Sequence, residues 1–294
     1  MRERGVESRV IGAYILPHGG IALNPSGFKA KTPLAKQLAW QIHRAAVHVG
    51  RYIESQRPEL ILLSTPHGAA DFSRFTFYLN ANASGFAETD NCQCPPCCYR
   101  LSAGLASAEA EQLMRQLASL GRNVSGTAFY GPPGSEEPAP LRWGEVIPLL
   151  FVKQLRQSRV IIISQPSRRY NHSVAMIPEL LQLGEDLYVR LERMKERADG
   201  PYGFSPAAQP FDKACGDWVK SMQPQYLLQR AAAFAQDAKS CGYTGLVMLQ
   251  GMLQKLGLSH WKSSLQANSH PSYYGMLHSF SHSRSYNLAY IEGL

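Results

Sequence analysis

The chain has 294 residues, of which 45% are hydrophobic and 18% are charged. A chain of this length and composition can bury roughly three quarters of its unfolded surface, which excludes an intrinsically disordered protein. Its 30 Lys and Arg residues against 22 Asp and Glu residues give a formal charge of +8, but the basic residues are spread along the chain without a nucleic-acid-binding motif, so we expect no nucleic-acid partner.

The apolar runs predict no membrane segment. The longest, residues 60–63, 146–152 and 160–163, fall far short of the ~18 to 20 residues that a spanning helix needs. Apolar residues 10–16 follow a charged start, but a turn sequence ends them without the cleavage motif of a secretory signal. We therefore predict a cytoplasmic protein, in which six cysteines favour thiols or metal ligands over disulfides.

Short apolar runs that end in turn sequences predict a β-sheet. Residues 10–16, 59–64 and 159–164 are typical of buried strands. Between the first two, residues 32–56 carry apolar side chains at spacings of three and four after Thr32-Pro33, which predicts a long amphipathic helix. This strand–helix–strand order makes a parallel pair. The predicted class is α/β, with a mixed, mostly parallel sheet flanked by helices.

The remaining pattern predicts further elements within a single domain. We expect strands at residues 72–79 and 124–129, helices at residues 107–120, 143–157, 172–197, 224–239 and 243–256, and long loops at residues 131–140 and 198–211. Residues after 263 are weakly patterned. We therefore place one domain at residues 8–262 and treat residues 263–294 as a C-terminal tail.

Two of the predicted strands end in the same tripeptide. Pro17-His18-Gly19 follows the first strand, and Pro66-His67-Gly68 follows the second. Because ligands of parallel α/β sheets bind beyond the carboxyl ends of the strands, both imidazoles are expected at the functional edge. Two neutral imidazoles on rigid turns suit a divalent transition metal with open coordination positions. The alternative is that each His makes only loop hydrogen bonds, but the repetition favours metal ligands.

The two His turns belong to a larger set of motifs. The others are Trp143-Gly144-Glu145-Val146-Ile147-Pro148-Leu149 and Gly200-Pro201-Tyr202-Gly203-Phe204 with Phe211-Asp212. Together, over residues 10–256, they resemble the LigB-type catalytic subunit of class III extradiol ring-cleavage dioxygenases, to which Memo-like proteins are related in fold. The resemblance implies a LigB-like α/β fold, a non-haem Fe(II) held by two histidines and a carboxylate, and O2-dependent cleavage of a small catecholic aromatic substrate.

The third metal ligand departs from the family pattern. The family has a Glu at the start of a late helix, and the matching place here is at Cys241. Memo-like members have a Cys there, so the resemblance implies the metal ligands His18, His67 and Cys241, with Asp237 as a carboxylate alternative. A thiolate shifts the metal preference from Fe(II) towards Zn or Cu. The alternative for Cys241 is a buried thiol without a metal.

The catalytic base also departs from the family. Family members carry it on a strand before the Gly-Pro-Tyr-Gly loop, and here the predicted helix runs directly into that loop. A skipped exon, an error in gene prediction or a catalytically inactive variant would each explain this. His172, which follows the third predicted strand, is a candidate replacement base, and Arg168 or Arg169 is a candidate partner for a substrate carboxylate. The alternative for His172 is an exposed residue beside a helix cap.

A second departure is Trp143, which stands where the family has another active-site histidine. We therefore expect a substrate other than a standard catechol acid. Two functions stay open: an extradiol-type dioxygenase, or a Memo-like metal- or peptide-binding regulatory protein without ring cleavage. The pattern leaves the oligomeric state open, a homo-oligomer included.

Four cysteines crowd into one short segment, Cys92-Gln93-Cys94-Pro95-Pro96-Cys97-Cys98. A structural zinc site normally uses two separated ligand pairs, so one tetrahedral ion held by all four is disfavoured. We rank structural loop thiols first, redox-sensitive thiols second and zinc ligands third.

Overall fold

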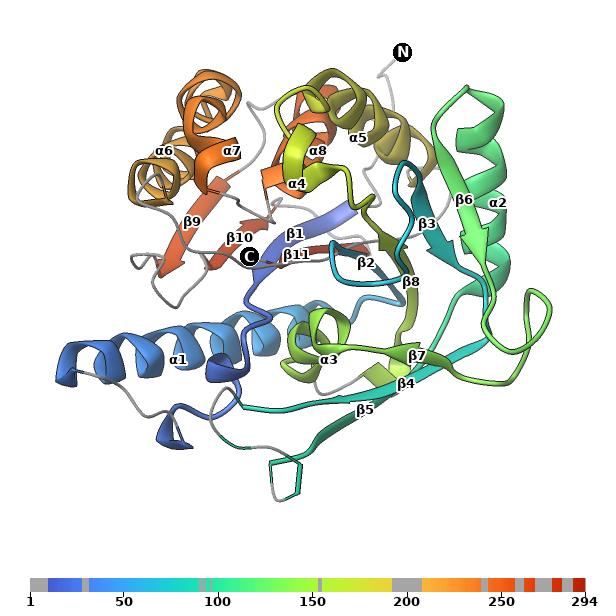
Figure 1. The fold of residues 1–294 in the computed structure, drawn as a ribbon, viewed down its shortest axis with the longest axis horizontal. Coiled ribbons are helices and arrows are strands. Elements are labelled where there is room, and N and C mark those ends of the chain that lie inside the picture. The colour runs from blue at the N-terminus through green and yellow to red at the C-terminus, as the bar shows by residue number, and fades with distance from the viewer. Residues whose placement is uncertain are drawn as a thin grey trace, which may run out of the picture.

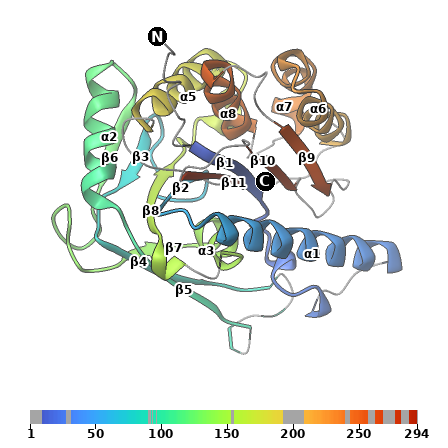
Figure 2. The ribbon, with the colours of Figure 1, turned by 180° about the vertical axis from the view of Figure 1, so that it is seen from behind.

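The computed structural model describes residues 10–27, 32–89, 92, 94, 95, 97–152, 155–191, 208–238, 243–256, 262–267, 277–281 and 288–293. Within these ranges, one large sheet lies between two layers. Helices α5 to α8 cover one face (Figure 1), and the view from behind shows α1, α3 and a small sheet on the other (Figure 2).

The large sheet has eight strands in the order β6-β3-β8-β2-β11-β1-β10-β9. The four central strands, β8, β2, β11 and β1, are parallel, whereas β3 runs antiparallel to β8 and β10 runs antiparallel to β1 and β9. The predicted mixed sheet is confirmed. Its strands are β1 (Val10–Leu16), β2 (Leu60–Thr65), β3 (Phe75–Tyr78), β6 (Val124–Thr127), β8 (Arg159–Ser164), β9 (Lys262–Ala267), β10 (Leu277–Ser281) and β11 (Leu288–Gly293).

The small sheet and the helices complete the two outer layers. The small sheet has the order β5-β4-β7, with β4 (Asn82–Ala87), β5 (Tyr99–Gly104) and β7 (Ala139–Leu141). The α-helices are α1 (Pro33–Gln56), α2 (Ser107–Ser119), α3 (Trp143–Leu150), α4 (Arg169–His172), α5 (Ile177–Leu191), α6 (Ala208–Ser221), α7 (Ala232–Ala238) and α8 (Tyr243–Leu256). Short 3-10 turns occupy Gly20–Ala22, Pro25–Gly27 and Leu155–Gln157. Among the helices of the described ranges, none is long and apolar enough to cross a membrane.

The central strands are buried on both faces, which explains their uninterrupted apolar sequences. In β2, Leu60 and Leu62 pack in the core under α5 and α8, and Ile61 and Leu63 pack in the core under α1 and α3. A strand covered on one face only would alternate apolar and polar residues. The predicted strands at residues 10–16, 59–64 and 159–164 are confirmed, within a residue at their ends.

Helix α1 is also confirmed, and its ends have local causes. The Thr32 hydroxyl accepts a hydrogen bond from the Ala35 N–H at 3.1 Å, and Pro33 begins the first turn. Such an N-cap satisfies a backbone donor that has no partner inside the helix. Arg57 ends the helix in the left-handed conformation, with φ of 47°.

Three predicted helices differ from the structure. The segment 172–197 contains α5, which begins only at Ile177, because Pro178 fits the first turn of a helix but not its interior. The segment 143–157 forms α3, which ends at Leu150, followed by a 3-10 turn. The segment 224–239 begins with a π-helix, Tyr226–Ala231, before α7. The loop expected over residues 198–211 already enters α6 at Ala208, and residues 192–207 lie outside the described ranges.

The C-terminal segment is where the structure differs most from the expectation, which was a tail outside the domain. It supplies β9, β10 and β11, and β11 lies in the middle of the sheet, parallel to β2 on one side and to β1 on the other. Its residue Ile291 pairs with Leu63 of β2 and with Tyr14 of β1. The boundary expected after residue 262 therefore does not separate the sheet from a tail.

The four clustered cysteines form disulfides, so the expectation of thiols or metal ligands over disulfides is wrong for them. Cys92 bonds to Cys97 and Cys94 bonds to Cys98, with Cα separations of 5.6 and 4.7 Å. Both separations fall in the range of about 4.4–6.8 Å that a disulfide requires. The cysteines lie between β4 and β5, whose antiparallel pairing brings the two ends of the loop together. Cys215, in α6, is buried and takes no part in these disulfides.

Candidate functional site

The two repeated turns meet at one edge of the large sheet. His18 follows the carboxyl end of β1, and His67 follows the carboxyl end of β2. Their ring centres are 5.7 Å apart, with the planes tilted by 44°. His18 is only 1% exposed and His67 is half-buried. The structure therefore brings together the two residues that the sequence predicts as metal ligands.

Helix α3 begins directly against the His67 turn. The Trp143 ring centre lies 5.3 Å from that of His67, and the residue is 40% exposed. At the next residue, Gly144, an added Cβ would lie 3.0 Å from the His67 Cβ and 3.1 Å from the Thr65 hydroxyl oxygen. Glycine is therefore what lets the helix approach this closely.

A buried hydrogen-bond chain supports the same turn from behind. The Tyr78 hydroxyl donates to Glu145 Oε1 at 2.9 Å and accepts from the Ala69 N–H at 2.8 Å. The Arg142 N–H donates to Glu145 Oε2 at 2.9 Å. Burial raises the pKa of Glu145 to about 7, although these hydrogen bonds lower it, and burial together with the Glu145 charge raises the pKa of Tyr78. The chain connects the turn after His67 to the first turn of α3.

Helix α4 also contacts His67, through Tyr170. The Tyr170 hydroxyl lies 3.4 Å from His67 Nδ1, and Tyr170 as a whole is 40% exposed. The buried Arg169 guanidinium stacks on this ring at 4.0 Å. It also donates to the main-chain oxygens of Pro66 and Pro166, so it ties the His67 turn to the turn after β8.

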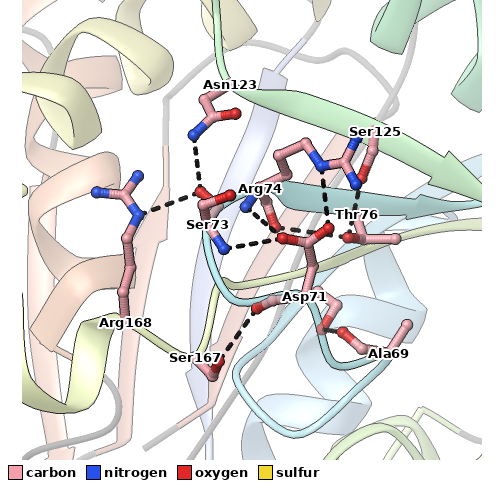
Figure 3. Close-up of polar contacts among 10 residues, drawn as sticks. Ala69, Asp71, Ser73, Arg74, Thr76, Asn123, Ser125, Ser167 and Arg168 are labelled. Atoms are coloured by element: carbon pink, nitrogen blue, oxygen red, sulfur yellow. Dashed lines mark hydrogen bonds and ion pairs between the residues drawn. The ribbon is translucent and has the colours of Figure 1, made fainter.

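The position of α4 is fixed by the loop that leads from His67 to β3 (Figure 3). The Ser167 N–H donates to the Asp71 main-chain oxygen at 2.8 Å, and Arg168 Nε donates to the Ser73 oxygen at 3.1 Å. Burial alone would raise the pKa of the Asp71 carboxyl, but hydrogen bonds from the Arg74 and Ser73 N–H groups and from the Arg74 side chain hold it below its usual value. An ionised Asp71 thus anchors the loop to which α4 is attached.

The start of α8 is joined to the same edge by Gln165. The Gln165 side chain donates to the Ser64 hydroxyl at 2.7 Å and accepts from the Thr244 hydroxyl, and its main-chain N–H donates to the Thr65 oxygen at 2.7 Å. Gln165 is buried. It therefore connects the ends of β2 and β8 with the first turn of α8.

The other predicted site residues lie as follows. His172 is exposed at the end of α4. Arg168 forms an ion pair with Glu179, at 2.7 Å to Oε1, rather than presenting itself to a ligand. Cys241 and the Asp237 side chain lie outside the described residues. Among the described residues, no group of three or more His, Cys, Asp or Glu side chains is placed to hold a metal ion.

Sequence reasoning missed two residues of this edge, Tyr170 and Gln165. Neither belongs to a repeated or spaced motif. Gln165 directly follows β8, and Tyr170 lies five residues further on. The available signal was position, because residues just after a parallel strand lie at the edge where ligands bind.

Comparison with known proteins supports the fold. No family model and no curated protein matches the chain. Among solved structures, the chain is similar to the crystal structure of the uncharacterized protein JW3007 from Escherichia coli K12. The TM-score is 0.53 at 12% sequence identity, over 92% of this chain and 99% of that chain. At that identity the similarity shows a shared α/β fold and gives no information on the activity of this protein.

Proposed function

We propose that the protein is a LigB-type extradiol dioxygenase, which uses a non-haem Fe(II) and O2 to open a catecholic aromatic ring. The observation that carries the proposal is the His pair. Two imidazoles, on identical turns that follow two parallel strands, lie with ring centres 5.7 Å apart at the sheet edge where ligands bind.

The His pair fits a shared metal ion. Two imidazoles bound to one ion through bonds of about 2.1 Å have ring centres roughly 5 Å apart, close to the observed separation. His18 and His67 would hold the metal, and the family resemblance adds Cys241 as the third ligand. An Fe(II) ion bound there would supply the redox chemistry that ring opening of a catechol by O2 requires.

The surrounding residues would orient His67 and receive the substrate. With Nε2 as the metal-binding atom, the His67 Nδ1–H is left to donate to the Tyr170 hydroxyl, which fixes the ring and its tautomer. Trp143 and Tyr170 both contact His67 and are partly exposed, and their aromatic surfaces suit a planar aromatic ligand. His172, on the same helix as Tyr170, is the candidate to accept a substrate proton.

The test is metal content after anaerobic loading with Fe(II), with zinc and copper monitored by the same elemental analysis. We expect about one iron per chain in the native protein, and loss of that iron in His18→Ala and in His67→Ala. The matched control is His48→Ala, an exposed histidine on α1. Unchanged metal content in both site variants would refute the proposed centre.

Oxygen uptake with a panel of catechols then separates the dioxygenase from the second candidate. The loaded enzyme is expected to consume O2 with at least one catechol, and neither site variant is expected to do so. Metal held through both histidines without uptake on any catechol would instead favour a Memo-like metal- or peptide-binding regulatory protein. Zinc or copper in place of iron would also favour the Memo-like regulatory protein.

A further inference from the structure

The loop between β4 and β5 carries chemistry that the proposed metal centre does not use. Its four cysteines form two interleaved disulfides, because Cys94 lies between the partners Cys92 and Cys97, and Cys97 lies between the partners Cys94 and Cys98. Both bonds therefore lie within one segment of seven residues.

These disulfides are expected to contribute little to the stability of the fold. The bonded cysteines are only five and four positions apart in the sequence. The stabilisation from a disulfide grows with the length of the loop that it closes, so bonds this local constrain the unfolded chain weakly. The two ends of the loop are also held together without them, because β4 and β5 pair through six residue pairs and β7 adds a third strand.

The four cysteines are accessible enough to react. Each of them is half-buried, in contrast to the buried thiol of Cys215. Thiol–disulfide exchange requires that an attacking thiolate reach a sulfur atom, so partly exposed bonds exchange where buried ones do not.

Interleaving also couples the two bonds. Opening the Cys92–Cys97 bond releases a thiolate inside the segment that contains the Cys94–Cys98 bond. The internal thiolate attacks a sulfur of the second bond at a high effective concentration, forms a new disulfide within the segment and releases another thiolate, so the remaining bond moves among the four sulfur atoms until a second dithiol reduces it. The same argument holds if the Cys94–Cys98 bond opens first.

We propose that the segment Cys92 to Cys98 is a site of reversible thiol–disulfide exchange, whose partner is a protein dithiol of the thioredoxin class. A partner thiolate attacks one sulfur, breaks the S–S bond and forms a mixed disulfide. The second partner thiol then resolves this mixed disulfide. Each loop disulfide gains two electrons and two protons from one dithiol, so two dithiols become two disulfides as the loop gains four thiols.

The test is reduction of the folded, full-length protein with thioredoxin that is kept reduced, in the presence of a metal chelator. Samples are quenched with an alkylating reagent, and labelled peptides are counted by mass spectrometry. We expect four labels on the loop peptide and none on Cys215, with a melting temperature that changes by less than about 4 °C. Oxidised glutathione should then restore both bonds.

Two variants test the coupling and control for indirect effects. In the double variant Cys92→Ser/Cys97→Ser, the remaining bond lacks an internal thiolate, so we expect only the Cys94–Cys98 pairing in samples quenched during reduction, whereas the native protein that has lost one bond should show rearranged pairings of Cys92 or Cys97 with Cys94 or Cys98. Cys215→Ala should leave the loop kinetics unchanged. Native protein that shows only the two original pairings throughout reduction, bonds that open only in denaturant, or loss of cooperative melting on reduction would each overturn the proposal.

Discussion

Glu145 is a carboxylic acid without exposed surface, and its pKa of about 7 has a consequence for stability. Its pKa in the unfolded chain is the ordinary 4.5. The folded protein therefore binds a proton at this residue more tightly than the unfolded chain does. The corresponding stability is fully present below pH 4.5 and is lost as the pH rises through 7, a loss of roughly 3 kcal/mol for this shift.

Replacement of Glu145 by Gln should remove this pH dependence. The amide keeps the shape of the carboxyl group, can accept from the Arg142 N–H and donate to the Tyr78 hydroxyl, and has no proton to lose. We expect the free energy of unfolding of the native protein, measured by urea titration, to fall between pH 5 and pH 8 by roughly 3 kcal/mol more than that of the variant. Glu137→Gln, at an exposed carboxyl, is the matched control. Parallel pH profiles for the native protein and Glu145→Gln would contradict this account.

Tyr170 tests how His67 is held. The Tyr170→Phe change removes only the hydroxyl that contacts His67 Nδ1. Loss of such an outer partner of a metal-binding histidine typically weakens metal affinity by about 10- to 100-fold. We expect this loss in a competition titration with a metal indicator, without a change in melting temperature because the Tyr170 ring is partly exposed. Tyr130→Phe, at an exposed tyrosine, is the control, and equal affinities in the two variants would remove Tyr170 from the site.

At the scale of elements, the sequence predicts best where one local cause decides the structure. Helix α1 has an N-cap, a proline in the first turn and a continuous apolar stripe, and its predicted bounds agree with the observed ones. Strands β1, β2 and β8 are apolar because both faces are covered. For α5 the sequence predicts a start that is too early, because the apolar periodicity extends upstream of Pro178 while the proline sets the start of the helix.

The packing of α3 on the His67 turn leads to a prediction for this element. In a helix, Gly→Ala normally stabilises by up to about 1 kcal/mol. At Gly144, however, the added Cβ would lie 3.0 Å from the His67 Cβ, so the helix or the turn must shift. We expect Gly144→Ala to destabilise the protein by about 1–3 kcal/mol, the usual cost of overpacking, as measured by urea unfolding.

The control for this prediction is Gly104→Ala in β5, where an added Cβ meets nothing within 4 Å. That variant should be neutral or slightly stabilising. A Gly144→Ala protein as stable as the native one would mean that the turn adapts to the helix, and that glycine is not what sets their distance.

At the scale of the whole molecule, part of the candidate site follows from the sequence and part does not. The repeated Pro-His-Gly turns were enough to pair His18 with His67, because parallel strands deliver their carboxyl ends to one edge. The strand between them was not predictable. β11 comes from a segment of weak pattern near the C-terminus, and its place is decided by long-range pairing with β1 and β2. No local signal specifies such a pairing.

The central position of β11 makes the C-terminal segment a condition for folding. Without β11, β1 and β2 would each expose a row of unpaired backbone N–H and C=O groups in the interior of the sheet. The two His turns, which follow these strands, would also lose their common support. We therefore expect a chain that ends at residue 287 to lose cooperative thermal unfolding and stoichiometric metal binding together.

The measurement is calorimetry of the shortened chain beside one that ends at residue 293, which keeps all of β11. The longer chain should melt as the native protein does. A shortened chain that still melts cooperatively would show that β1 and β2 pair or pack adequately without β11, and the domain would then end where the sequence pattern weakens. If that chain also kept its metal, the His pair would depend on the two turns and on α3 and α4 alone.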